Sequence, residues 1–150
     1  MKAMRSAIAK IEPYTGAIAE RVIQAGALGN SCRVKICLNL ITYLQWTAAF
    51  ESAALAKAAG LPLEVLEEAG RANGQLTDLM VSFMALHKVP DAARKSEGMQ
   101  DYLRTNMHVA EKDLAHALTL AREAGVALPG AALVSQLMAR IYGVEDPGRR

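Results

Sequence analysis

The longest hydrophobic pattern of the chain runs from Ser31 to Ala59, and neither glycine nor proline interrupts it. Asn30 or Ser31 can begin a helix here, because a short polar side chain accepts hydrogen bonds from the free N–H groups of the first turn. Gly60 is typical of the position that follows the end of a helix. The pattern therefore predicts one helix of about 29 residues, roughly 44 Å long at 1.5 Å per residue.

Apolar side chains occur around most of the circumference of this predicted helix. One half carries Val34, Cys37, Leu38, Ile41, Leu44, Ala48 and Leu55, and much of the other half carries Leu40, Tyr43, Trp46 and Phe50. A helix that is apolar on nearly every side must be surrounded by other segments. A chain of 150 residues can hardly wrap such a helix by itself, so a second copy is implied and we expect a homodimer.

The uncharged part of the same pattern is too short for a membrane. It runs from Ile36 to Phe50 and contains the polar residues Asn39 and Gln45. A membrane-spanning helix needs about 20 predominantly apolar residues. We therefore expect a buried central helix and no association with a membrane.

Shorter helical patterns follow along the chain. Helices are predicted at about Leu63 to Ala72, Thr77 to His87, 106 to 124 and Pro129 to about Tyr142, with a mostly irregular loop from Lys88 to Thr105 that contains a short helical piece. A further short helix is expected at residues 3 to 12, closed by Pro13. No sustained alternation typical of a strand appears. We predict an all-α fold, with a connecting segment at residues 1–29 and a helical domain at residues 30–150.

Charge and cysteine content narrow the class of protein. The formal net charge is only +2, and the basic residues form no dense stripe with aromatic residues between them, so nucleic-acid binding is not expected. Cys32 and Cys37 lie five positions apart on different faces of one predicted helix, so we expect them unpaired and buried, as in a reducing compartment. The beginning of the sequence has no continuous apolar run typical of a signal peptide, so a cytoplasmic location is predicted.

The segment from Gly26 to Asn39, GALGNSCRVKICLN, combines glycines with a lysine and an asparagine. Its glycine spacing does not match the dinucleotide-binding loop G-x-G-x-x-G, so we reject a phosphate-cradling loop here. Lys35 and Asn39 are four positions apart and therefore share one helix face. They could form a polar site in which partial burial prepares the lysine for proton transfer, or Lys35 could extend to solvent while Asn39 satisfies a packing defect. Spacing alone favours the second interpretation.

The same segment resembles the signature G-x-x-G-x-G-x-x-x-K-x-x-x-N of the β-hydroxyacid dehydrogenases, the family of 3-hydroxyisobutyrate dehydrogenase and tartronate semialdehyde reductase. The stretches FESAALAKAAGLPLEVL and YLRTNMHVAEKDL are similar to two further segments of that family. The resemblance extends over roughly residues 15 to 143 and implies the all-helical C-terminal domain of such an enzyme, without its N-terminal Rossmann domain. Ser31 and Leu38 stand where the family has a glycine and, in many members, a second asparagine.

The resemblance implies a role for three residues. Lys35 corresponds to the catalytic lysine, Asn39 to an asparagine that holds substrate and lysine, and Lys112 to a lysine near the nicotinamide end of the cofactor. It also implies NAD or NADP as cofactor, a small β-hydroxyacid or semialdehyde as substrate, and no activity of this chain alone.

Two alternatives remain open: a non-catalytic helical dimerisation module, and a related reductase of semialdehydes, sugar acids or imines. A metal site is not predicted, because His108, Glu111 and His116 are offset by three and five positions and do not converge on one ion.

Overall fold

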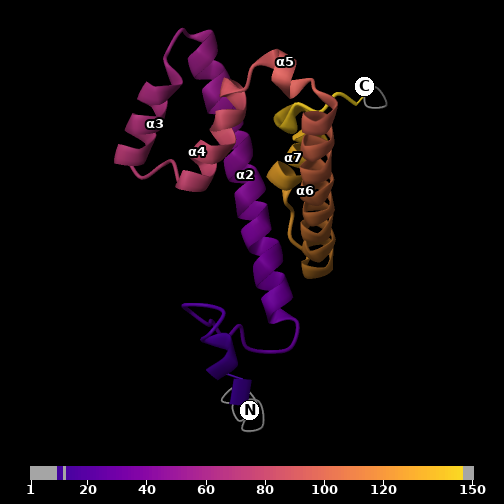
Figure 1. Ribbon diagram of the computed structural model, residues 1–150. Coiled ribbons are helices and arrows are strands. Elements are labelled where there is room, and N and C mark those ends of the chain that lie inside the picture. The colour runs from indigo at the N-terminus through magenta and orange to yellow at the C-terminus, as the bar shows by residue number, and fades with distance from the viewer. Residues whose placement is uncertain (1–9, 12, 147–150) are drawn as a thin grey trace. The chain divides into compact units, whose positions relative to one another are not determined.

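The computed structural model describes residues 10–11 and 13–146, and that part of the chain contains helices and no strand (Figure 1). The predicted all-α fold is confirmed. The chain divides into two compact units, Met1–Val34 and Lys35–Arg150, which are treated separately below. The main helices are α2 (Asn30–Ala58), α3 (Leu63–Ala72), α4 (Asp78–Met84), α5 (Asp91–Arg94), α6 (Glu97–Ala124) and α7 (Pro129–Tyr142), with a 3₁₀ turn η1 (Ala85–Lys88) after α4.

The first unit contains a short helical stretch and the turn that leads into α2. Residues 13–15 are helical, so the prediction that Pro13 closes the first helix is wrong; the φ of proline is itself compatible with a helix. Residues 3–9 and 12 of that predicted helix lie outside the described residues. The turn before α2 places Gly26 and Gly29 at φ of 90° and 86°. Asn30 closes this turn, because its Nδ2 donates to the carbonyl of Ala25 at 2.9 Å.

The long helix α2 begins and ends within one residue of the predicted limits. Gly60 follows it with a φ of 74°, a conformation that glycine adopts without the steric cost of a side chain. The N–H of Leu61 donates to the carbonyl of Ala56 at 2.9 Å, and the N–H of Gly60 donates to that of Lys57 at 3.1 Å. This hydrogen-bond pattern satisfies carbonyls at the end of the helix and stops it.

Within the described residues, only one side of α2 is covered. Tyr43, Thr47 and Ala53 are buried, whereas Leu38 and Ile41 are about half exposed. The described part of the chain therefore does not surround α2 by itself, and the second copy expected to cover the rest stays a prediction. Cys32 and Cys37 are unpaired, as predicted, but both are exposed rather than buried.

Helix α6 differs most from its prediction. It begins at Glu97, within the segment predicted to be mostly a loop, and runs to Ala124. Glu97, Asp101 and Thr105 of its first turns are exposed, while Leu103 and Met107 are buried four positions apart. Gly98 is tolerated in this first turn, where a side chain would meet only open space. The polar composition that indicated a loop is in fact the outer face of an amphipathic helix.

Helices α6 and α7 lie side by side in the second unit, on the other side of α2 from α3 and α4 (Figure 1). Leu114 of α6 and Val134 and Met138 of α7 belong to one hydrophobic cluster, which Tyr43 of α2 joins. A second cluster lies where α2 meets α3 and α4 and includes Ala49, Ala53, Met80 and Met84, with Leu66 and Leu76 against it. No helix in the described residues is long and apolar enough to cross a membrane.

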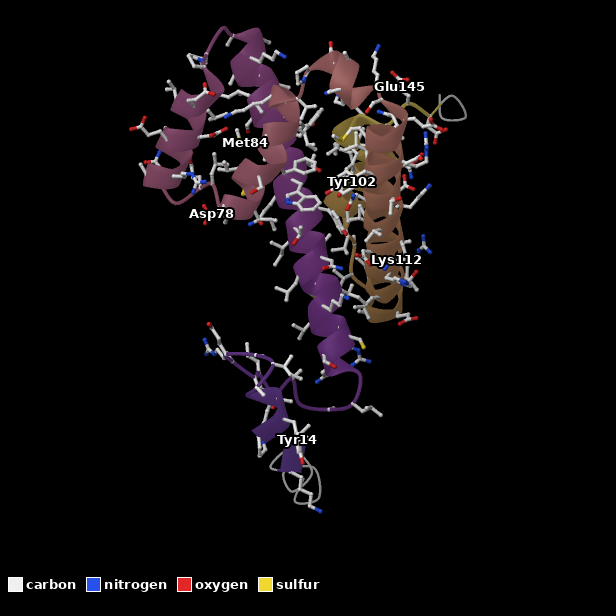
Figure 2. The ribbon with its side chains drawn as sticks, viewed as in Figure 1. Tyr14, Asp78, Met84, Tyr102, Lys112 and Glu145 are labelled. Atoms are coloured by element: carbon white, nitrogen blue, oxygen red, sulfur yellow. The ribbon has the colours of Figure 1, made fainter. Side chains whose placement is uncertain are left out.

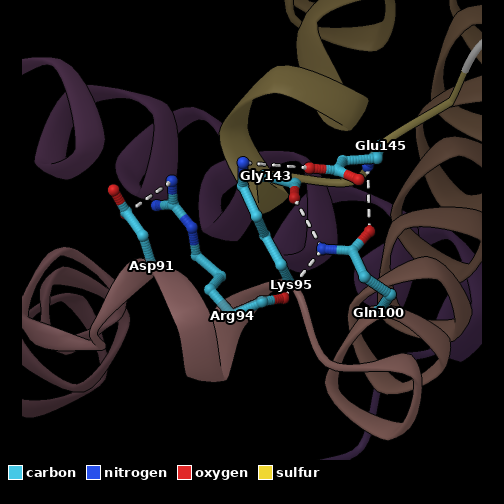
Figure 3. A network of polar contacts seen from close by, with 6 residues as sticks. All are labelled: Asp91, Arg94, Lys95, Gln100, Gly143 and Glu145. Atoms are coloured by element: carbon cyan, nitrogen blue, oxygen red, sulfur yellow. Dashed lines mark hydrogen bonds and ion pairs between the residues drawn. The ribbon is translucent and has the colours of Figure 1, made fainter.

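Gln100 joins the start of α6 to the end of α7 (Figure 3). Its Nε2 donates to the carbonyls of Arg94 and Gly143, at 3.0 and 3.1 Å, and its Oε1 accepts from the N–H of Glu145 at 2.9 Å. The residue is buried, so these backbone groups depend on its amide for their hydrogen bonds. These hydrogen bonds link the N-terminal end of α6 to the C-terminal end of α7.

We expect Gln100→Leu to lower the free energy of unfolding by about 1–3 kcal/mol, because it leaves buried backbone groups without partners. Chemical denaturation of the chain measures this difference. Gln136→Leu is the matched control, since Gln136 is an exposed residue of α7. Equal stability of the two variants would show that the three hydrogen bonds do not hold this end of the molecule.

Candidate functional site

A line of polar side chains runs along one face of α2 in the second unit. Lys35, Asn39, Tyr43 and Thr47 follow one another at intervals of four residues, which places them roughly one above the other on the helix. Lys35 is exposed, Asn39 is half-buried, and Tyr43 and Thr47 are buried. The line therefore leads from solvent into the core.

Asp113 of α6 meets this line from the neighbouring helix. Its Oδ2 accepts a hydrogen bond from Nδ2 of Asn39 at 2.7 Å and another from the hydroxyl of Tyr43 at 3.0 Å. Its other oxygen, Oδ1, accepts from Nζ of Lys112 at 2.5 Å. One carboxylate thus joins two residues of α2 to a residue of α6, and Lys112 can be followed on that helix in Figure 2.

The surroundings of Asp113 favour its charged form. Partial burial acts to raise the pKa of this carboxyl, but the hydrogen bonds from Lys112 and Tyr43 and the positive charges of Lys112 and Lys35 outweigh burial, so the pKa is lowered. The side chain of Asp113 is only 12% exposed. A carboxylate that stays ionised there is a permanent acceptor for the three donors.

Tyr43 is a permanent donor in the same group. Burial raises the pKa of its phenol, and the hydrogen bond and negative charge of Asp113 raise it further, so the hydroxyl stays protonated. The ring is held edge-on against Trp46, with 5.6 Å between ring centroids. Thr47 supports the backbone at this point through a hydrogen bond from its hydroxyl to the carbonyl of Tyr43 at 2.8 Å.

The structure brings two of the three sequence-predicted site residues into direct contact with one group. Asn39 and Lys112 both bind Asp113, although they are far apart in the sequence. Lys35 lies one turn before Asn39, and its charge acts on Asp113. Lys35 is exposed, however, so the chain alone does not provide the partial burial considered for it. The catalytic and binding roles of these residues stay predictions.

Sequence analysis missed Asp113 and Tyr43. Asp113 directly follows Lys112 within the segment that resembles the family, and no role was assigned to it. Tyr43 was grouped with the apolar side chains of α2. The signal that could have found Tyr43 is the interval of four residues from Lys35 through Asn39, which continues to Tyr43 and Thr47.

The donor set of this group fits the polar end of a dinucleotide. Two ammonium groups and an amide are available to the oxygens of a carboxamide or a ribose, and the side chain of Lys112 is 59% exposed. The group contains no glycine-rich turn at a helix N-terminus, the arrangement that commonly cradles a pyrophosphate. Within the described residues, no three histidine, cysteine, aspartate or glutamate side chains are grouped in a way that could hold a metal ion.

Comparison with known proteins identifies the family to which this helical chain belongs. A family profile described as "NAD-binding of NADP-dependent 3-hydroxyisobutyrate dehydrogenase" matches residues 29–147. The chain belongs to this family, and the predicted cofactor class, NAD or NADP, is in accord with the description of the family. The resemblance to the β-hydroxyacid dehydrogenases is confirmed.

Two curated relatives are uncharacterized oxidoreductases of Mycobacterium tuberculosis, one from strain CDC 1551 / Oshkosh and the other from strain ATCC 25618 / H37Rv. Each is 31% identical to this chain over 129 residues, which is 86% of the chain and 43% of the relative. The chain therefore spans less than half the length of these relatives. No solved structure matches the chain.

Proposed function

We propose that this chain is the substrate-contacting helical domain of an NAD(P)-dependent oxidoreductase that acts on a small β-hydroxyacid or semialdehyde. The observation that carries the proposal is the position of Lys35, exposed on α2 one turn before an asparagine whose amide is held by Asp113. Membership of the dehydrogenase family supports the cofactor class. An exposed ammonium beside a fixed amide can bind a polar substrate at the surface of the domain through hydrogen bonds.

In this proposal Lys35 transfers the proton and Asn39 holds the substrate. The nicotinamide cofactor, when bound, supplies or accepts the hydride. Negative charge then builds on the substrate oxygen as a carbonyl is reduced, and Nζ of Lys35 donates a proton to that oxygen; the same nitrogen accepts the proton during oxidation. Asn39 uses one N–H for Asp113 and keeps its other N–H and its Oδ1 for the substrate.

A nucleotide-binding domain is required beside this chain for the proposed activity. The sequence contains no G-x-G-x-x-G segment, and the curated relatives are more than twice as long as the matched region. Lys112 is the residue of this chain that we assign to the nicotinamide end of the cofactor.

Calorimetry and a turnover assay test the proposal. The chain alone should bind NADPH more weakly than micromolar, whereas the complete oxidoreductase that contains it should bind NADPH and reduce a small semialdehyde. Micromolar affinity of the chain alone would mean that the cofactor site has been misplaced. Absence of cofactor-dependent turnover in the complete protein, across small hydroxyacids and semialdehydes, would contradict the proposed reaction.

We further propose that the protein is a homodimer in which a second copy covers the exposed side of α2. Leu38, Ile41 and Leu55 of this helix are 57%, 50% and 71% exposed. Water-exposed apolar side chains gathered on one helix are typical of an interface between subunits. The described part of the chain offers no segment that covers them.

Sedimentation at micromolar concentration should therefore show a dimer. Ile41→Asp should shift the protein toward monomer, because it places a charge within the apolar contact. Leu133→Asp is the control, since Leu133 is equally apolar and 63% exposed but lies on α7. A wild-type chain that sediments as a monomer would contradict the proposal.

A further inference from the structure

Tyr43 has a buried hydroxyl that the proposed mechanism does not use. The residue is 7% exposed, and phenylalanine would fill the same place among the surrounding aromatic rings without a polar atom. Its hydroxyl instead donates to Oδ2 of Asp113, the same oxygen that accepts from Asn39. Burying a hydroxyl costs free energy unless it makes a hydrogen bond. The contact with Asp113 supplies that hydrogen bond.

The shared oxygen determines how the amide of Asn39 is oriented. An ionised carboxylate only accepts hydrogen bonds, so Asn39 must present Nδ2 to Asp113 and keep Oδ1 free for other partners. Among the hydrogen bonds of the described residues, the Asp113 carboxylate is the one acceptor that holds this amide in place. The orientation of Asn39 thus depends on where Oδ2 of Asp113 is held.

Besides Asn39, two donors hold the Asp113 carboxylate, one at each oxygen. Lys112 binds Oδ1 through a long side chain that is 59% exposed and flexible, whereas Tyr43 binds Oδ2 through a rigid ring packed in the core. A flexible partner holds a group less precisely than one whose rotamer is locked by packing. Without the hydroxyl of Tyr43, Asp113 can follow Lys112 toward solvent, and Asn39 loses its fixed partner.

We propose that Tyr43 is a positioning residue, which holds Asp113 so that Asn39 presents a fixed amide to the substrate. This inference rests on the proposed function of Asn39 as the substrate-holding residue. Tyr43 does not touch the substrate; it acts through Asp113, and the three side chains form one unit between α2 and α6. The chemistry it serves is recognition of a polar oxygen or hydroxyl of a small substrate.

Tyr43→Phe in the complete oxidoreductase tests the inference, because it removes one oxygen and keeps the ring. We expect kcat/KM to fall by about 10- to 150-fold, the loss of one hydrogen bond to a charged group, with most of the change in KM. Tyr142→Phe is the matched control: Tyr142 is also buried, contacts the same Trp46, and has no contact with Asp113 among the described hydrogen bonds. Equal kinetics of the two variants would overturn the inference.

A double-mutant cycle shows whether Tyr43 acts through Asn39. Once Asn39→Ala is present, adding Tyr43→Phe should change KM by less than twofold, because residues that act as one unit are not additive. Full additivity would overturn the inference. If Lys35→Met leaves turnover unchanged, the proposed function itself fails; if Lys35→Met is impaired and Tyr43→Phe is not, only the present inference fails.

Carbon-13 NMR of the chain supplies a readout that does not depend on activity. The carboxyl of Asp113 should titrate at higher pH in Tyr43→Phe than in the wild type, because a donor to its charged form has been removed. The side-chain amide signals of Asn39 should also shift. Tyr142→Phe should leave both unchanged, and an unmoved Asp113 titration in Tyr43→Phe would contradict the contact on which the inference rests.

Discussion

Lys35→Met in the complete oxidoreductase is expected to lower kcat by about 10²- to 10⁴-fold, the range for loss of a general acid or base. Negative charge that builds on the substrate oxygen then has no proton donor at Nζ. The loss corresponds to about 3 to 5 kcal/mol of barrier, since each 1.36 kcal/mol is tenfold in rate. Methionine keeps much of the length of the lysine side chain without its charge, so packing on α2 changes little. Steady-state kinetics at saturating cofactor measure the effect.

Lys57→Met is the control for this prediction. Lys57 is an exposed lysine in the last turn of the same helix, far along α2 from Asn39. Its replacement should leave kcat within about a factor of two, as is usual for surface substitutions away from a site. Cofactor affinity should be largely intact in both variants. If Lys35→Met keeps more than about a tenth of wild-type turnover, outside the range for general acid–base catalysis, a non-catalytic dimerisation module becomes the better interpretation.

Leu114→Ala is expected to lower the free energy of unfolding by about 2–5 kcal/mol. Leu114 is fully buried in α6, where it belongs to the hydrophobic cluster formed with α7 and Tyr43. Truncation removes buried methyl groups and leaves a cavity that close-packed helices can fill only in part. Urea denaturation followed by circular dichroism measures the change.

Leu133→Ala provides the comparison for Leu114→Ala. It makes the same substitution on α7 at a side chain that is 63% exposed, so the change should stay within about 0.5 kcal/mol. Similar losses in the two variants would mean that Leu114 is not part of a tightly packed core. Asp113 directly precedes Leu114, so Leu114→Ala could also disturb the hydrogen bonds of Asp113. Leu133→Ala is therefore the better background for kinetic work on Asp113 and its partners.

The local pattern of the sequence was sufficient for most helices. Helix α3 occupies the predicted residues Leu63–Ala72, and α7 runs from Pro129 to Tyr142 as expected. In both, the hydrophobic period and the proline or glycine at the ends act over a few residues, which sequence alone displays. The start of α6 was missed because a solvent-facing helix face and a loop have similar polar compositions. Whether Glu97 to Thr105 is helical depends on the buried side chains Gln100 and Leu103 that face α7.

The sequence by itself determined that Lys35 and Asn39 share one face of α2, because the helical period relates residues four apart without any other segment. Only the tertiary structure decided which residue meets them. Asp113 lies 74 positions from Asn39, and the packing of α6 against α2 brings its carboxylate to the amide and to the hydroxyl of Tyr43. Tyr43 has an apolar ring and one polar oxygen, and the hydrophobic pattern of α2 counts it only as an apolar residue. Its partner is set by a contact between distant segments, which no local period encodes.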